Sequence, residues 1–144
     1  MKLKKEKRFA DKHAPDIKPD SSIKAAILKH TENAKLPCAV AFEIAKTLGI
    51  SADSVGINAD LLNIKLIKCQ MGLFGYRPQK NIVKLPPQVD PDLEKAVLDA
   101  IIDGKLPCKA AWEIATRLNI SKLTVSGACE ALEVKIKPCQ LGAF

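Results

Sequence analysis

The sequence predicts a mainly α fold made of two tandem three-helix units, each followed by a short β-strand. The first observation is a gap-free internal repeat at an offset of 70 residues, in which Lys35-Leu36-Pro37-Cys38 returns as Lys105-Leu106-Pro107-Cys108. Of the 40 positions from Lys35 to Phe74, 18 are identical to their partners. The second is that 47% of the residues are apolar but only 4% aromatic, which favours helices with aliphatic cores. A regular repeat implies that both copies share one fold.

The repeat divides the chain into four predicted segments. A basic flexible arm covers residues 1–20, the first unit 21–75, a proline-rich linker 76–90 and the second unit 91–144. The net charge of +7 is spread over these segments as +3, +2, +2 and 0. The positive excess favours an anionic partner, although a basic arm can also be only a solvated tail. Because the second unit is neutral, the two copies are not expected to contribute equally.

Three helices are expected in each unit, and each helix has a start signal. The first helices follow aspartate caps, near 22–33 and from Pro91 to Gly104. The second helices start at prolines and continue with an apolar residue every three or four positions. The third helices follow serine caps and run over about 52–62 and 122–132. The prolines are Pro37 and Pro107, and the caps are Asp20, Asp90, Ser51 and Ser121.

The second and third helices have the spacing of a helix-turn-helix. This motif needs a small residue where the helices cross, glycine or a similar residue in the turn, and an apolar residue that locks the crossing. These residues are Ala45, Gly49 and Val55 in the first copy, and Ala115, Asn119 and Val125 in the second. Over about 25 residues per copy, the chain therefore resembles the helix-turn-helix of bacterial and archaeal transcriptional regulators. If the strand that follows is counted, it resembles the winged-helix variety.

The resemblance to a winged helix is partial. Ile64–Lys68 and Val134–Lys137 are β-branched and roughly alternating, so each predicts a short strand. A wing is a hairpin, but the second copy reaches Phe144 without a returning strand. Either the unit needs no full wing, or a further candidate strand at Asn81–Leu85 is shared between the copies.

The resemblance implies that double-stranded DNA is the partner and that polar residues of the third helices reach base edges. The alternative is a helix-turn-helix scaffold that serves protein contacts or self-association without binding DNA. Asp53 near the start of the first reading helix is unfavourable, whereas Leu123 stands at that position in the second. The candidate DNA-binding residues are Ser51, Ser54, Asn58, Ser121, Lys122, Thr124 and Ser126 on the third helices, and Lys65, Lys68, Lys135 and Lys137 on the strands.

Four of the five cysteines belong to the repeat. Cys38 and Cys108 open the second helices, Cys69 and Cys139 follow the strands, and Cys129 stands alone. The four repeated thiols are buried small side chains in a reducing compartment, a redox-sensitive pair in each unit, or ligands of a shared metal. No close C-x-x-C pair exists, so no metal or other cofactor is expected, and a thiol- or metal-responsive sensor is a minor alternative.

Each copy ends in Cys-Gln-(Met/Leu)-Gly-(Leu/Ala)-Phe. Gly72 and Gly142 are expected to turn the chain so that Phe74 and Phe144 cover the apolar side of their units. A ligand site is the alternative for this segment.

Catalysis and membrane insertion have no support in the sequence. The two histidines, His13 and His30, do not repeat, and no phosphate-binding loop or nucleophile motif is present. Apolar runs are far shorter than the roughly 20 residues of a membrane span, and no secretory leader follows Met1. We expect a cytoplasmic protein that is not an enzyme.

Overall fold

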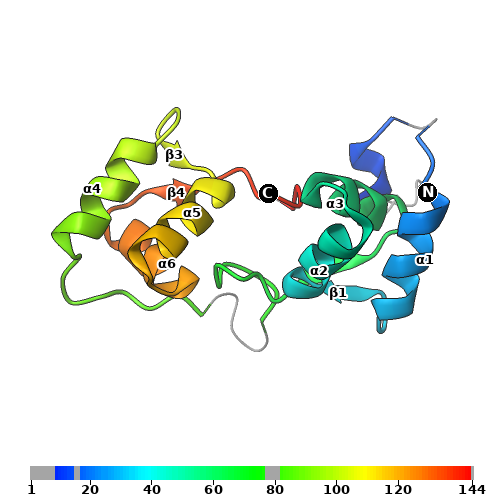
Figure 1. The fold of residues 1–144 in the computed structure, drawn as a ribbon, viewed down its shortest axis with the longest axis horizontal. Helices are drawn as coiled ribbons and strands as arrows, with labels where there is room; N and C mark the ends of the chain where they lie inside the picture. The colour runs from blue at the N-terminus through cyan, green and yellow to red at the C-terminus, as the bar shows by residue number, and fades with distance from the viewer. Residues whose placement is uncertain (1–8, 15–16, 77–81, 144) are drawn as a thin grey trace, which may run out of the picture. The chain divides into compact units, whose positions relative to one another are not determined.

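The computed structural model describes residues 9–14, 17–76 and 82–143, and Figure 1 draws the others as a thin trace. The prediction of a mainly helical fold with a few short strands is confirmed. The chain divides into two compact units, Met1–Ile67 and Lys68–Phe144. The sequence predicts the division within 76–90. The boundary instead lies before the tail of the first repeat, because that tail packs in the second unit.

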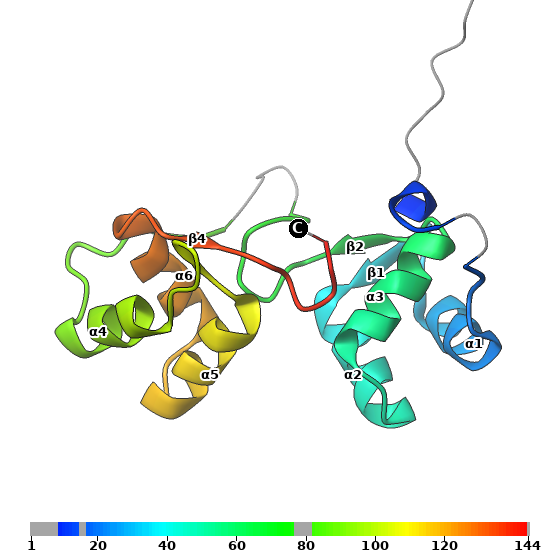
Figure 2. The same cartoon turned by 90° about the horizontal axis from the view of Figure 1, so that it is seen from above.

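The first unit contains three helices around one core, with each helix in contact with the other two. The same grouping of α1, α2 and α3 can be followed in Figure 1 and, from above, in Figure 2. The order of its elements is η1 (Phe9–Lys12), α1 (Ser21–His30), β1 (Lys35–Pro37), α2 (Cys38–Leu48), α3 (Ala52–Leu61) and β2 (Lys65–Ile67).

The second unit repeats this arrangement at the same offset of 70 residues. Its elements are α4 (Pro91–Ala100), β3 (Lys105–Leu106), α5 (Cys108–Leu118), α6 (Lys122–Ala131) and β4 (Lys135–Ile136). All three of its helices also pack on one another. Two predicted helix ends lie too far along the chain, because α1, predicted to reach residue 33, ends at His30, and α4 ends at Ala100. Gly104, which is predicted to end this helix, has φ +77° in the turn before β3.

Most of the predicted helix caps are confirmed, because the side chains of Asp20, Ser51 and Ser121 accept backbone N–H groups at the starts of their helices. The prediction is wrong for Asp90, whose side chain makes no capping hydrogen bond at the start of α4. α2 ends at Gly49 and α5 at Asn119, both in the left-handed conformation that these residues tolerate. The Ser51 hydroxyl accepts the backbone N–H of Ser54 at 3.2 Å, and the equivalent bond at the start of α6 is 3.1 Å. The same local chemistry therefore sets the start of both third helices.

Each unit has a two-stranded parallel sheet in which the strand after the third helix pairs with a strand before the second helix. Lys35 is opposite Lys65 in the first sheet, and Lys105 is opposite Lys135 in the second. The strands β1 and β3 were not predicted, because two or three residues are too few to show alternation. The candidate strand in the linker is wrong for Ile82–Leu85, which have no regular structure, and Asn81 lies outside the described residues. No sharing of a linker strand is therefore seen in the described part of the chain.

The core of the second unit includes residues from the tail of the first repeat. Cys69 and Met71 are buried in it together with Leu93, Val97 and Val125, and Phe74 packs against the same cluster. The prediction that Phe74 covers its own repeat unit is therefore wrong. Phe144, for which the same was predicted, lies outside the described residues.

None of the helices in the described part of the chain has the length and apolar character that crossing a bilayer requires.

Candidate functional site

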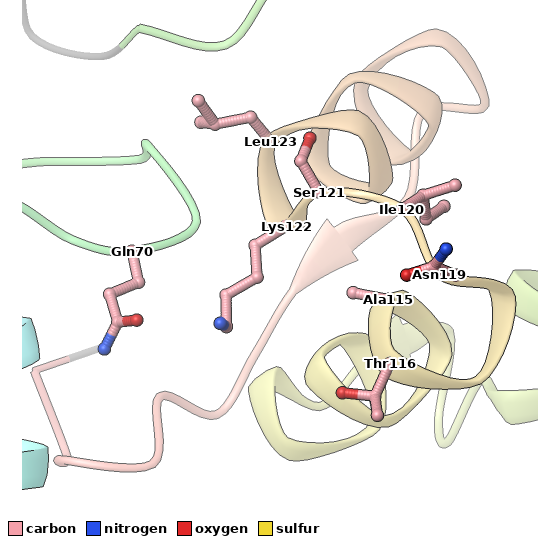
Figure 3. Close-up of a pocket in the computed structure, with 8 residues that line it drawn as sticks. All are labelled: Gln70, Ala115, Thr116, Asn119, Ile120, Ser121, Lys122 and Leu123. Atoms are coloured by element: carbon pink, nitrogen blue, oxygen red, sulfur yellow. The ribbon is translucent and has the colours of Figure 1, made fainter.

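The turn between α5 and α6 borders an open pocket of about 540 Å³. Figure 3 shows Ser121, Lys122 and Leu123 at the start of α6, with the Lys122 side chain extending on the side of Gln70. Ser121 and Thr124 are exposed, and their hydroxyl oxygens lie 2.7 Å apart. The first turn of α6 thus presents two hydroxyls and one ammonium group to the surface.

The ammonium group of Lys122 lies 4.4 Å from the centre of the Trp112 ring. A cation over an indole face is attracted by the ring quadrupole, which holds this flexible side chain against α5. The charge of Lys122 is therefore kept beside the turn, where an anion could meet it.

The middle of α6 cannot contact a partner, since every residue from Val125 to Cys129 is buried. Ser126 is 2% exposed, and its hydroxyl donates to the Met71 carbonyl at 2.6 Å. A Cβ on Gly127 would lie 2.6 Å from the Lys84 carbonyl oxygen, so the linker also passes directly over this helix. Ser126 was a candidate for base contact. The structure removes it from the candidate surface, because it holds the tail of the first repeat.

Asn58 leaves the candidate surface for a similar reason. The residue is 7% exposed, its side-chain amide donates to the Ser54 carbonyl at 2.8 Å, and its side-chain oxygen accepts the Asp20 N–H at 2.7 Å. Asn58 therefore ties α3 to the start of α1. Ser51 is exposed and Ser54 half-buried, with their hydroxyls 2.8 Å apart, but the exposed neighbour Asp53 is an anion.

Part of the predicted flexible arm is a structural cover for α3. Asp60, which is 6% exposed, has a carboxylate oxygen 3.1 Å from Lys12 Nζ and 2.9 Å from His13 Nε2. Nearby, the Ala10 N–H donates to the Asn63 side chain at 3.3 Å. A buried carboxylate needs such partners. The flexible-arm prediction is wrong for residues 9–14, while residues 1–8 lie outside the described part of the chain.

The four candidate lysines of the strands, Lys65, Lys68, Lys135 and Lys137, are all exposed. Lys65 and Lys135 each face another lysine across a parallel pair of strands. Like charges directly opposite on a sheet are destabilising, and their cost falls when an anion lies between them. This pairing could not be found without knowing that β1 and β3 are strands.

All five cysteines carry free thiols, and only Cys139 is not buried. Burial raises the pKa of Cys69 and Cys108. Backbone N–H groups of the tail turn act in the opposite direction on Cys69, as does the side chain of Gln140 on Cys108. A negative charge on Cys139 raises the pKa of both thiols, so the three sulfur atoms interact electrostatically within the second unit.

Comparison with protein-family models, with curated proteins and with solved structures found no match to this chain.

Proposed function

We propose that this chain is a small DNA-binding regulator of the helix-turn-helix type, in which the second unit makes the closest contact with DNA. The observation that carries the proposal is the first turn of α6, where Ser121, Lys122 and Thr124 stand at the surface after a left-handed turn. In helix-turn-helix proteins, N-terminal residues of the second helix contact base edges. Hydroxyls and a lysine are suited to base edges and phosphates.

The burial of α6 beyond this turn limits how the helix can be used. Because Val125–Cys129 are covered, α6 would approach the groove with its N-terminal end rather than along its length. Most of the binding free energy is then expected from phosphate contacts by Lys122, Lys135 and Lys137. Such contacts give strong salt dependence and modest sequence preference.

The first unit would contribute less to base reading. The first turn of α3 carries Asp53 where α6 carries Leu123, and a carboxylate there repels the phosphate backbone. Lys65 and Lys68 remain exposed and would contact phosphates only.

The test is fluorescence anisotropy with a random-sequence duplex, titrated at a series of salt concentrations. Lys122→Glu should weaken binding and lower the salt slope by about one relative to the wild type. Lys95→Glu is the matched control, because Lys95 is an exposed lysine on α4 of the same unit and the charge change is identical. Absence of binding at low salt, or an equal effect of both variants, would falsify the proposal.

The second candidate function is a protein-interaction module on the same scaffold. The covered centre of α6 favours it, because a helix already packed on both sides has little surface left for a groove. In that case the duplex would not bind at low salt, although the chain would be folded by circular dichroism.

A further inference from the structure

An open pocket of about 730 Å³ lies at the end of α6, between that helix, the strand β4 and the tail of the first repeat. All of these segments belong to the second unit. Leu73 and Phe74 of the tail, together with Val134 before β4, give the pocket an apolar wall. The exposed residues Glu130 and Glu133 line it as well. A volume in this range is typical of pockets that hold a ligand.

The first unit has the same backbone at the equivalent place. Glu130 corresponds to Asp60 of α3. Glu133 corresponds to Asn63, and both have a left-handed φ, +56° and +54°. Each of these two residues donates its N–H to the carbonyl three residues earlier, at 3.2 and 2.9 Å, and the next N–H donates to the carbonyl five residues earlier, at 2.8 and 2.9 Å. The two places can therefore be compared residue by residue.

In the first unit this place is occupied by η1, which packs on α3. A carboxylate oxygen of Asp60 lies 3.1 Å from Lys12 Nζ and 2.9 Å from His13 Nε2. The Asn63 side-chain oxygen accepts the Ala10 N–H at 3.3 Å. The repeat therefore contains its own example of an occupant, a short helical turn whose basic side chains meet the end of the third helix.

In the described part of the second unit the same place is uncovered, since Glu130 and Glu133 are exposed and the pocket is open. An exposed carboxylate holds a cation only weakly, so ion pairs alone would not retain a segment there. Burial of an apolar side chain against Phe74 and Val134 supplies the larger share of the binding free energy. The negative end of the α6 dipole favours a cation at the same point.

We propose that this pocket binds a short helical segment of a partner protein. The segment presents a basic side chain to Glu130 and Glu133, and an apolar side chain to Phe74 and Val134. Its chemistry is that of η1, which fills the equivalent place in the first unit.

Two lysines of the second unit, Lys135 and Lys137, also line the pocket. They do not exclude a basic segment, because Lys65 stands at the position of Lys135 in the unit that binds η1. Both lysines are also among the proposed phosphate contacts. The partner site goes beyond the proposed DNA binding, and its test is therefore made without DNA.

The test is an NMR titration of the ¹⁵N-labelled full chain with a capped peptide of residues 9–14, Phe-Ala-Asp-Lys-His-Ala. Amide signals of residues 130–137 and of Phe74 should shift when the peptide is added. Those of α3 should stay in place, because the chain's own arm competes there at an effective concentration of about millimolar or more. The control peptide carries glutamate at both basic positions and should bind the wild type more weakly.

A charge exchange tests the two glutamates. Glu130→Lys combined with Glu133→Lys should weaken binding of the basic peptide by about tenfold, since two exposed ion pairs, each worth up to about fivefold, are replaced by repulsion. The same variant should prefer the glutamate-containing peptide. Asp99→Lys combined with Glu113→Lys is the matched control, because both residues are exposed in the same unit, do not line the pocket and give the same change of net charge. It should bind the basic peptide like the wild type.

Both double variants alter exposed positions, and circular dichroism should show that they are folded. Three results would overturn the proposal: no shift at residues 130–137, equal weakening by the control pair, or shifts confined to α3. A fourth concerns the occupant. If the signals of residues 130–137 change with protein concentration in the absence of peptide, and sedimentation shows a dimer, the occupant is a second copy of this chain and not a partner protein.

Discussion

Helices α3 and α6 hold equivalent places in the repeat and begin with the same serine cap, but different segments cover them. The cover of α3 is η1, held by polar contacts between Asp60 and the side chains of Lys12 and His13. The cover of α6 is the tail of the first repeat and the linker. The Ser126 hydroxyl donates to the Met71 carbonyl of the tail, and the Lys84 carbonyl of the linker lies close to Gly127. Duplication preserved the scaffold, and the segments outside the helices made the two surfaces unlike.

The difference follows from single residues at equivalent positions. Asp60 corresponds to Glu130, which is exposed, so the second unit has no buried carboxylate at this place to attract an arm. Gly127 corresponds to Ile57, whose side chain would fill the space that the linker occupies above α6. Each cover therefore depends on a residue that the other copy lacks.

The largest effect is expected from Met71→Ala. Met71 is fully buried in the second core although it belongs to the first repeat, and removal of such a side chain costs about 2–5 kcal/mol. Amide hydrogen exchange should show lower protection in α4, α5 and α6, with α1 to α3 unchanged. Leu98→Ala, at a half-exposed position on α4, is the control and should change stability by less than about 0.5 kcal/mol. An equal loss of protection in both units would contradict the assignment of the tail to the second unit.

A smaller effect is expected from Asp60→Ala. Hydrogen bonds to charged groups contribute about 1.5–3 kcal/mol each, but Lys12 is partly exposed, so a loss of about 2 kcal/mol in the free energy of unfolding is expected. Limited proteolysis should then cut within residues 9–14. Glu130→Ala at the equivalent exposed position should be nearly neutral. Equal urea midpoints for the two variants would mean that η1 does not depend on Asp60.

The last effect is confined to alkaline pH and distinguishes Cys129 from its counterpart, Ala59. Because the pKa of Cys129 rises from 9.0 to about 11 on folding, the unfolded chain loses its proton first. The stabilisation is complete below pH 9 and is lost as pH rises towards 11, by about 1.4 kcal/mol per pH unit at most. Urea unfolding at pH 8 and pH 10.5 should show this slope in the second unit, and Cys129→Ala should reduce it. An unchanged slope in that variant would assign the effect to other groups.

The helices could be predicted from the sequence because their signals are local. Apolar residues at helical spacing, serine caps and the left-handed Gly49 and Asn119 identify the helices within a residue or two at most ends. The strands β1 and β3 could not, because Lys-Leu-Pro is too short for a periodic signal and is stabilised only by pairing with a distant strand.

The sequence correctly predicted which candidate residues are accessible only where accessibility depends on the position of a residue along its own helix. Ser121 and Thr124 are exposed and Lys122 is half-buried in the first turn of α6, which could be predicted because all three lie off the apolar stripe of the helix. Asn58 and Ser126 were misassigned because their burial depends on Asp20 and Met71, which are 38 and 55 residues away. No local pattern contains such contacts. The gap-free repeat also suggested that each tail belongs to its own unit.

The hydrogen bond from Ser126 to Met71 joins residues 55 positions apart. The two units are therefore expected to fold at different times during synthesis. During synthesis Met71 emerges early, but its binding place is complete only after α6 has left the ribosome. The second unit must therefore close a long loop before its core is filled, whereas the helices of the first unit can pack as soon as they are made. The sequence repeat and the compact unit therefore have different boundaries. A fragment that begins after Phe74 would lack Cys69 and Met71, so the core of the second unit would be incomplete.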